Sequence, residues 1–249
     1  MKINKDSIYG FIIGDCLGVP YEFSQSNNIK KLEMTTGTHN QLPGTWSDDT
    51  ACLLATLDTD ITNIVSVCEN LQEVVSGKYF PDGVRYDIGF ATHKALTGQD
   101  RTKVLQDGNG ALMRILPYAF LDNYSSLKNT HLVTKIAELT HYSSFSNGCC
   151  LTYLRFINNA LKGNFEIKGD FDYQSKNGYV VDSLKIVLKV CSEATSYSDG
   201  MVRCINIGGD TDTHCALTGA YLAIKYKDWE KYVKQIRNIE LIEGILKKY

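Results

Sequence analysis

Along most of the chain, apolar residues recur every three to four positions, the spacing that gathers them on one face of an α-helix. Residues 64–75 are the clearest case, with Thr62 as the predicted N-cap and Gly77 as the predicted stop. Residues 184–194 repeat the pattern after Asp182, a residue type that favours helix N-caps. Similar helices are predicted over residues 6–18, 49–57, 88–97, 110–121, 131–140, 147–162, 212–226 and 229–247.

Two features interrupt this helical pattern. Pro117 lacks a backbone N–H and is expected to bend or end the helix over residues 110–121. Residues 164–181 carry Gly, Asp and Asn at spacings typical of a loop or a small hairpin. Since no internal repeat, low-complexity tract or Pro/Ser-rich linker divides the sequence, we predict one all-α domain over residues 1–249.

Composition narrows the class of protein. The 249 residues are 43% hydrophobic and 22% charged, which is ordinary for a globular chain with a sizeable core. A formal net charge of −2 gives no electrostatic footprint for nucleic acid or an anionic membrane, so neither is expected as a partner. Asp15 interrupts the N-terminal apolar run, which argues against a signal peptide, and no stretch approaches the ~20 apolar residues of a membrane span. The eight cysteines form no CxxC pair and are expected to be buried free thiols, so we predict a cytoplasmic protein.

Two acidic motifs stand at predicted helix starts that are far apart in the sequence. The first is Ser47-Asp48-Asp49-Thr50, and the second is Asp210-Thr211-Asp212-Thr213. Ser, Asp and Thr are favoured N-cap residues, so capping alone accounts for either motif taken singly. Capping needs one side-chain oxygen per helix, however, and each motif carries several. If the two helix starts converge, about four carboxylates face one another and require cations such as Mg²⁺, which prefers oxygen ligands.

Asp15 and Glu22 form a third acidic cluster. Asp15 falls on the apolar face of the helix predicted over residues 6–18, so it is either buried with a partner or lines a site. Glu22 follows Pro20 and, taken alone, fits a carboxylate on a surface loop. The sequence leaves both alternatives open.

Two further segments suggest contacts with a ligand. Residues 108–110 read Gly-Asn-Gly at a helix start, where exposed amides suit a phosphate and an Asn-capped turn is the alternative. His141 stands beside Tyr142 and close to Phe145, an arrangement that also fits a histidine packed between aromatic rings in the core.

Taken together, these segments resemble the ADP-ribosylglycohydrolase family, in order and through most of the chain. Ser47 departs from the family's usual threonine but keeps the hydroxyl, and His214 occupies a position that is commonly aliphatic. The matching residues are Gly14, Asp15, Gly18 and Glu22; Ser47 to Thr50; Asn109, Gly110, Met113 and Arg114; Thr140 and His141; Gly178, Tyr179, Val180, Ser183 and Leu184; and Gly208 to Thr213.

The resemblance implies a compact, single-domain orthogonal helical bundle with a cleft that contains two Mg²⁺ or Mn²⁺ ions. It also implies hydrolysis of the bond between ADP-ribose and a protein side chain or a small acceptor. The implied metal ligands are Ser47, Asp48, Asp49, Asp210, Asp212 and Thr213, and the implied catalytic carboxylates are Glu22, Asp49 and Asp87. The implied substrate-binding residues are Gly108, Asn109 and Gly110 for the pyrophosphate, His141, Tyr142 and Phe145 for the ribose or adenine, and Tyr179.

The segment Tyr86-Asp87-Ile88-Gly89 resembles the arginine-directed members, which favours arginine-linked ADP-ribose as the substrate. An N-cap role for Asp87 on the helix predicted over residues 88–97 explains the same pattern. Serine-linked ADP-ribose and O-acetyl-ADP-ribose stay open, with Glu22 then acting as the acid–base residue. A different class of function is an immunity-type protein that neutralises an ADP-ribosyltransferase toxin by binding it, with or without hydrolysis. A metal-dependent phosphoester hydrolase is a third hypothesis.

Overall fold

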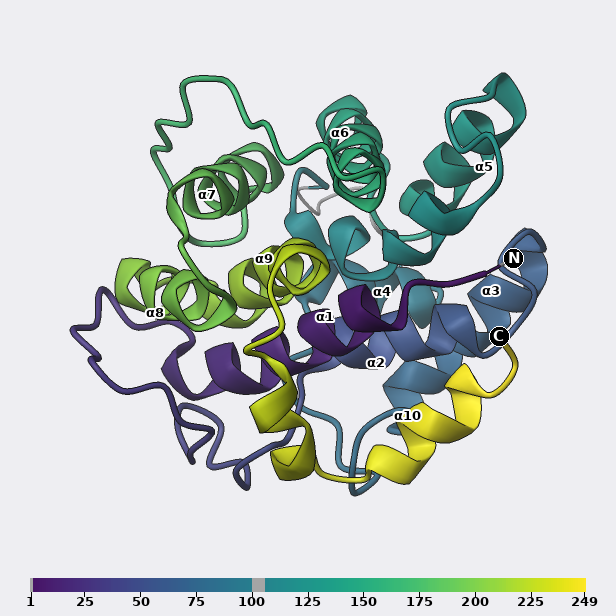
Figure 1. Cartoon of the computed structure of the whole chain (residues 1–249). Helices are drawn as coiled ribbons and strands as arrows, with labels where there is room; N and C mark the ends of the chain where they lie inside the picture. Colours follow the sequence, from purple (N-terminus) through teal and green to yellow (C-terminus); the bar gives the residue numbers. More distant parts are fainter. Residues whose placement is uncertain (1, 100–105) are drawn as a thin grey trace.

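Helices form nearly every element in the residues that a computed structural model of the chain describes, 2–99 and 106–249 (Figure 1). Within these residues the β-type pairings are two isolated bridges, Ser24 with Gly209 and Gly108 with Tyr179. The all-α class predicted from the hydrophobic spacing is therefore confirmed. The α-helices are α1 (Lys5–Gly18), α2 (Asp48–Leu57), α3 (Ile64–Ser76), α4 (Phe90–Leu96), α5 (Leu127–Glu138), α6 (Ser144–Leu161), α7 (Val180–Glu193), α8 (Tyr197–Ile207), α9 (Thr211–Lys225) and α10 (Ile239–Leu246). The 3₁₀ helices are η1 (Val19–Tyr21), η2 (Asn109–Arg114), η3 (Leu116–Phe120) and η4 (Glu230–Gln235).

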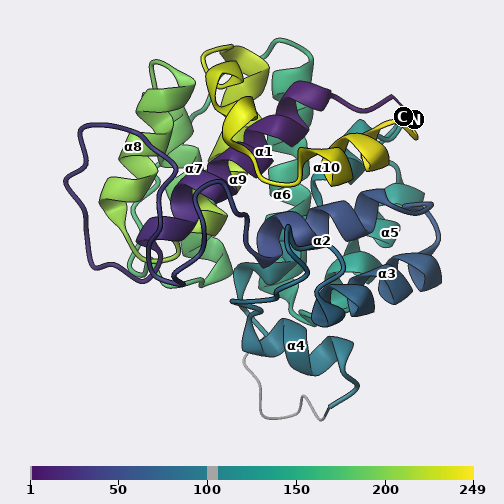
Figure 2. The same ribbon diagram turned by 90° about the horizontal axis from the view of Figure 1, so that it is seen from below.

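Helices α1 and α9 lie against each other at the centre of the molecule and make the most extensive helix contact in the described structure (Figures 1 and 2). Glycines at four-residue intervals on α1 face the backbone of α9. A Cβ atom built on Gly14 would lie 2.2 Å from the carbonyl oxygen of Cys215, and one built on Gly219 would lie 2.2 Å from that of Gly10. Residues without a side chain are therefore what allows the two backbones to approach this closely.

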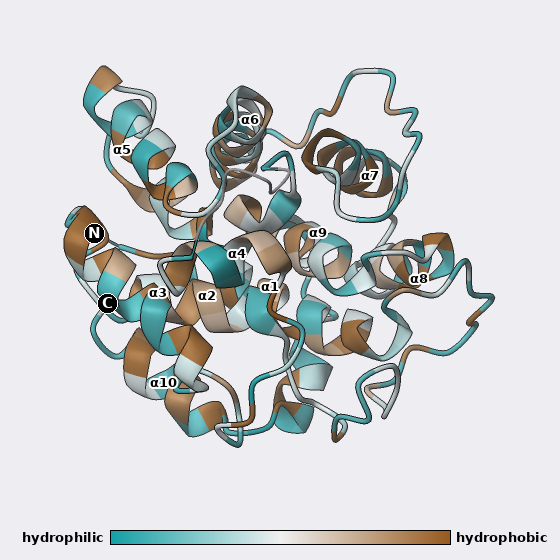
Figure 3. Cartoon of the chain, turned by 180° about the vertical axis from the view of Figure 1, so that it is seen from behind, coloured by the Kyte–Doolittle hydropathy of each residue, from teal (hydrophilic) through white to brown (hydrophobic). Residues whose placement is uncertain are grey.

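The other helices surround this central pair. Helices α7 and α8 pack against α9, α6 contacts both α5 and α7, and α2 connects α1 and α9 to α3. Polar and apolar residues alternate along outer helices such as α3, α5 and α8 (Figure 3). The apolar face predicted for residues 64–75 is confirmed by the burial of Val67, Leu71 and Val74 on α3. None of the helices in residues 2–99 and 106–249 has the length and hydropathy to cross a membrane.

The prediction of one helix over residues 110–121 is wrong. The segment forms two 3₁₀ helices, η2 and η3, with Pro117 in the first turn of η3. Pro117 acts here as predicted, because a residue without an N–H fits a helix start and interrupts a continuous α-helix.

The helix predicted over residues 229–247 is also broken, at the residues between η4 and α10. Arg237 donates its backbone N–H to the carbonyl oxygen of Gly44 at 3.0 Å and its guanidinium to Asp82 at 3.0 Å. Asn238 adopts a left-handed backbone with φ of 45°. These contacts with distant residues replace the helical hydrogen bonds at the break.

Helix ends differ from the predictions in detail. Gly77 ends α3 in a left-handed conformation as predicted, with φ of 93°, but Asn63 and not Thr62 is its N-cap. The N-cap role predicted for Asp182 is wrong, because α7 begins at Val180 and the Asp182 carboxylate accepts the N–H of Ser175 at 2.9 Å.

One helix was not predicted, and two further predictions can be compared with the structure. The hydrophobic spacing did not predict α8. Of the loop or small hairpin predicted over residues 164–181, the structure has the loop, up to the start of α7. All eight cysteines are free thiols, and all but Cys68 are buried, as expected.

Candidate metal centre and active site

The first acidic motif forms the start of α2 and is hydrogen-bonded to a side chain of α1. Ser47 is the N-cap, and its hydroxyl accepts the N–H of Asp49 at 3.2 Å. The buried carboxylate of Asp15 accepts the N–H of Ser47 and that of Thr50, each at 3.0 Å. Burial raises the pKa of Asp15 to about 6, although these hydrogen bonds oppose the rise. Of the two alternatives for Asp15, the structure supports the first: it is buried with partners and fixes the start of α2.

The second acidic motif opens α9 and is anchored by the segment that follows α1. Gly209 has φ of 77° and donates its N–H to the carbonyl oxygen of Ser24 at 2.7 Å. In return, the N–H of Phe23 donates to the carbonyl oxygen of Gly209 at 2.8 Å. The hydroxyl of Thr211 donates to the carbonyl oxygen of Gly18 at 2.8 Å. These bonds place the start of α9 beside the end of α1.

The two motifs meet, although more than 150 residues separate them in the sequence. The hydroxyl of Thr213 donates to Oδ2 of Asp49 at 3.0 Å and joins the two helix starts directly. Carboxylate oxygens of Glu22, Asp210 and Asp212 lie within 4.8 Å of one another. Asp210 occupies the N-cap position of α9 without making a side-chain capping bond, so capping does not account for its carboxylate.

A cavity of about 250 Å³ opens where these carboxylates converge. Its described lining contains six acidic side chains and no Lys or Arg. The acidic lining residues are Glu22, Asp48, Asp49, Asp87, Asp210 and Asp212, and the others include Phe23, Gly89, Phe90, Thr92, Gly108, Asn109, Gly110, Met113, His141, Asn177 and Thr213.

The chemistry of this donor set fits a divalent cation. Oδ1 of Asp49 and Oδ1 of Asp212 are buried and have no hydrogen-bond partner. Burial, followed by repulsion from neighbouring carboxylates, raises the pKa values of Asp48, Asp49 and Asp212 well above the usual range. A cation bound between the two helix starts would remove the repulsion between the carboxylates, because it neutralises their charge. It would also bind the carboxylate oxygens that have no hydrogen-bond partner.

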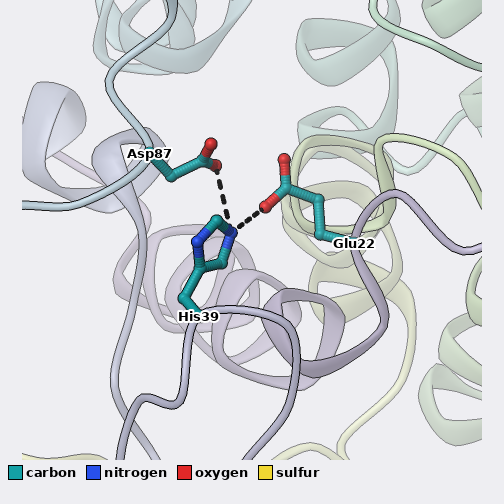
Figure 4. Close-up of side chains that lie close together, drawn as sticks. All are labelled: Glu22, His39 and Asp87. Carbon is teal, nitrogen blue, oxygen red and sulfur yellow. Dashed lines mark hydrogen bonds and ion pairs between the residues drawn. The ribbon is translucent and has the colours of Figure 1, made fainter.

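Glu22 and Asp87 reach the same cavity from two separate loops, with His39 between them (Figure 4). Nε2 of His39 lies 2.6 Å from Oε2 of Glu22 and 3.9 Å from Oδ2 of Asp87. Burial raises the pKa of Glu22 far above its usual range, and the charges of Asp87 and Asp210 add to the rise. Glu22 is 5% exposed, so the alternative of a surface-loop carboxylate is wrong.

The alternative role for Asp87, as an N-cap, is also wrong. Helix α4 begins at Phe90, with Gly89 in the N-cap position and no side-chain capping bond. The N–H of Gly89 instead points to Oδ2 of Asp48 at 3.4 Å. Asp87 itself has a left-handed backbone with φ of 54°, a conformation that costs a non-glycine residue about 1 kcal/mol or more.

The Gly-Asn-Gly segment also lines the cavity, but Asn109 is used differently from the prediction. Its N–H donates to the carbonyl oxygen of Gly178 at 2.9 Å, so this amide is already engaged. Its side-chain amide donates to Oδ2 of Asp210 at 2.7 Å and to the hydroxyl of Ser183 at 3.0 Å. The Asn-capped turn is wrong as well, since η2 has no side-chain capping bond. Asn109 therefore orients a predicted metal ligand.

His141 forms part of the cavity wall, and its ring lies against the glycines of this segment. A Cβ atom built on Gly110 would lie 2.7 Å from Cε1 of His141. Nδ1 of His141 lies 2.7 Å from the hydroxyl oxygen of Thr140, which in turn accepts a hydrogen bond from the guanidinium of Arg114 at 2.7 Å. The imidazole is thus fixed by the buried Arg114.

The aromatic residues predicted to border the substrate lie outside the cavity lining. Tyr142 is 66% exposed and Phe145 is 54% exposed, so neither packs around His141 in the core. Tyr179 pairs with Gly108 through an isolated bridge and is 37% exposed. The core-packing alternative for His141 between aromatic rings is wrong, although His141 itself is buried.

Sequence reasoning did not single out several residues of the site. His39 stands in an irregular loop without periodicity, so no pattern in that segment marks it. Phe23 and Phe90 line the cavity yet are more than half exposed, which places them at its mouth. Asn177 lies in the loop that precedes α7, where Gly and Asn indicated only a turn.

Comparison with known proteins agrees with this geometry. The family model described as ADP-ribosylglycohydrolase matches residues 5–175 and 166–229. The chain belongs to the ADP-ribosylglycohydrolase family. It is accordingly a hydrolase, and the resemblance drawn from its motifs is confirmed.

Relatives and a solved structure extend the comparison. The chain is 27% identical to the ADP-ribosyl-[dinitrogen reductase] glycohydrolase of Rhodospirillum rubrum, over 87% of this chain and 83% of the relative. It is 23% identical to the ADP-ribosylarginine hydrolase Tri1 of Pseudomonas putida (strain GB-1), over 89% of this chain and 70% of the relative. A solved chain titled ADP-ribosylglycohydrolase-related protein complex superposes with a TM-score of 0.76 at 21% identity, over 96% of this chain and 94% of that one. The structural likeness shows that this glycohydrolase has the same all-helical fold.

Proposed function

We propose that this glycohydrolase is a Mg²⁺-dependent enzyme that removes ADP-ribose from modified protein side chains, with arginine as the acceptor. The observation that carries the proposal is the meeting of two acidic helix starts in one cavity, with buried carboxylate oxygens left without partners. The names of the relatives, which refer to ADP-ribosylarginine and to dinitrogen reductase, support the arginine acceptor. A cytoplasmic location and binding to an ADP-ribosyltransferase stay predictions from the sequence.

The residues that would hold two Mg²⁺ ions, or Mn²⁺ in their place, come from the two helix starts. When bound, such ions act as Lewis acids that orient the ribose hydroxyls and a water molecule near the anomeric carbon. The unpartnered oxygens of Asp49 and Asp212 support this assignment most directly. The proposed ligands are Ser47, Asp48, Asp49, Asp210, Asp212 and Thr213.

Glu22 and Asp87 divide the two proton transfers of the proposed hydrolysis. The water oxygen bonds to the anomeric carbon as the bond from that carbon to the arginine nitrogen breaks. Asp87 accepts the proton of the water, and Glu22 supplies a proton to the departing nitrogen. Burial raises the pKa of Glu22, which favours its protonated form; burial also raises the pKa of Asp87, but a hydrogen bond from Glu22 and the charge of His39 oppose that rise. Asp49 stabilises the positive charge that develops on the sugar.

The rest of the substrate lies along the walls described above. Gly108, Asn109 and Gly110 form the wall proposed for the pyrophosphate. His141 borders the same wall and faces the ribose. Tyr142, Phe145 and Tyr179 are proposed to contact the adenine outside the acidic cavity, where their exposed rings offer a flat apolar surface.

The decisive assay incubates the protein with arginine-ADP-ribosylated protein in Mg²⁺ or in EDTA and measures released ADP-ribose. We expect release in Mg²⁺ only. It should be lost in Asp212→Asn and kept in the matched control Asp122→Asn, whose side chain is exposed outside the cavity. Release that persists in EDTA would contradict the metal dependence.

Assays with other substrates test which acceptor carries the ADP-ribose. Serine-linked ADP-ribose and O-acetyl-ADP-ribose are assayed under the same conditions, and turnover of either one in place of the arginine substrate would reassign the acceptor. Release of inorganic phosphate instead of ADP-ribose would indicate a phosphoester hydrolase. If none of the substrates is cleaved and a transferase co-purifies equally well with Asp212→Asn, the protein is a binder and the proposal is refuted.

A further inference from the structure

The carboxyl groups of Glu22 and Asp87 lie on one side of the cavity, with a residue outside every motif between them. The imidazole of His39 lies between them (Figure 4). Its Nε2 is 2.6 Å from Oε2 of Glu22 and 3.9 Å from Oδ2 of Asp87. These carboxyl groups come from loops that follow different helices, so their relative position depends on contacts between the loops, of which the hydrogen bond between Glu22 and Asp87 is one.

The loop that carries His39 is hydrogen-bonded to the backbone of the segment that carries Glu22. The hydroxyl of Thr38 donates to the carbonyl oxygen of Glu22 at 2.8 Å, and the N–H of Thr38 donates to that of Pro20 at 3.3 Å. A tight turn follows, in which the N–H of Asn40 donates to the carbonyl oxygen of Gly37 at 2.9 Å. Glu22 is therefore held through its backbone by Thr38 and through its carboxyl group by His39.

The ring of His39 also contacts the segment that carries Asp87. Its centroid lies 5.1 Å from that of Tyr86 and 6.1 Å from that of Phe23. The hydroxyl of Tyr86 donates to the carbonyl oxygen of Trp46, the residue before the N-cap of α2. The imidazole thus lies where the loop after α1, the loop before α2 and the loop before α4 meet.

We propose that His39 is a positioning residue for the hydrolysis. Its Nε2–H donates to Oε2 of Glu22, which orients the carboxyl group and leaves the other oxygen, Oε1, to carry the proton that is transferred. Packing of the ring on Tyr86 fixes the distance from Glu22 to Asp87. The inference rests on the proposed function, because it uses the roles assigned there to these two carboxyl groups.

Two substitutions separate positioning from general stability. His39→Gln keeps an N–H donor near the place of Nε2, whereas His39→Asn keeps a polar side chain that ends short of Glu22. We expect kcat to fall on the order of 10- to 100-fold in His39→Asn with little change in KM, and to recover most of this loss in His39→Gln. His131→Gln, on the exposed face of α5, is the matched control and should keep the wild-type kcat.

A double-mutant cycle with Glu22→Gln completes the test. If His39 acts through Glu22, His39→Asn should cause little further loss of kcat in the Glu22→Gln background. An equal loss in both backgrounds, a wild-type kcat in His39→Asn, or the same loss in His39→Gln as in His39→Asn would each overturn the inference. A wild-type protein that releases no ADP-ribose from any substrate would instead refute the proposed function, so the two failures are distinguishable.

Discussion

Replacing Gly14 with alanine tests the helix contact that brings the two acidic motifs together. A Cβ atom at this position would lie 2.2 Å from the carbonyl oxygen of Cys215, while ordinary contacts begin near 3.4 Å. The helices would have to separate locally by about 1.2 Å, and no rotamer change relieves the clash because the obstructing atom belongs to the backbone. Overpacking of this kind costs ~1–3 kcal/mol, and a rigid backbone obstacle favours the upper end of that range.

Alanine has a better helix propensity than glycine, which offsets ~1 kcal/mol of this cost. The expected net loss in the free energy of unfolding is about 2 kcal/mol, equivalent to a Tm about 4–8 °C lower for a chain of this length. Thermal and urea denaturation without Mg²⁺ measure the change. Gly244→Ala on α10 is the matched control, since a Cβ atom there meets nothing within 4 Å, and it should be neutral or stabilising. Equal stability of Gly14→Ala and Gly244→Ala would show that α1 and α9 do not need a glycine at this contact.

Three further predictions follow from the buried polar groups. Asp15→Asn replaces one acceptor oxygen by a donor opposite the N–H groups at the start of α2. Urea denaturation should show that the free energy of unfolding falls by about 2 kcal/mol, and an unchanged midpoint would contradict the role of Asp15 in fixing the start of α2. Because burial and repulsion raise the pKa values of Asp48, Asp49 and Asp212, the folded protein without metal holds protons that the unfolded chain releases, so its stability should fall as pH rises above ~4. The gain in Tm on adding Mg²⁺ should therefore be larger at pH 8 than at pH 5.5, and a larger gain at pH 5.5 would count against the assignment. Arg114→Lys removes the guanidinium that donates to carbonyl oxygens at the end of α5. A thermal melt should show that the free energy of unfolding falls by about 2 kcal/mol or more, and a wild-type Tm would contradict this structural role of Arg114.

Periodicity predicted the strongly amphipathic helices well. On α3, the burial of Val67, Leu71 and Val74 follows the 3.6-residue repeat because this helix has one apolar and one polar face. Helix α8 has a stripe of the same kind, but it begins with Tyr-Ser-Asp-Gly, whose polar residues and glycine hide the start of the repeat. The break between η4 and α10 was not predictable from local sequence. It depends on hydrogen bonds from Arg237 to Gly44 and Asp82, which are far away in the sequence.

For the site, the sequence indicated which carboxylates belong together but not how each is used. The surplus of side-chain oxygens at two helix starts predicted that they meet, and the hydrogen bond between Thr213 and Asp49 bears out that meeting. The role of Asn109 as a donor to Asp210 depends on a contact across 101 residues, which local pattern cannot reveal. His39 belongs to no motif, and only the folded loops place it beside Glu22.

The proposed function requires that the two acidic helix starts share divalent cations. An anomalous difference map from crystals grown in Mn²⁺ would locate these ions, because Mn²⁺ takes the oxygen ligands of Mg²⁺ and scatters anomalously. We expect two peaks in the cavity, bound by carboxylates of both Asp48-Asp49 and Asp210-Asp212. A map with no peak between the two helix starts, or with ions bound by one motif alone, would contradict it.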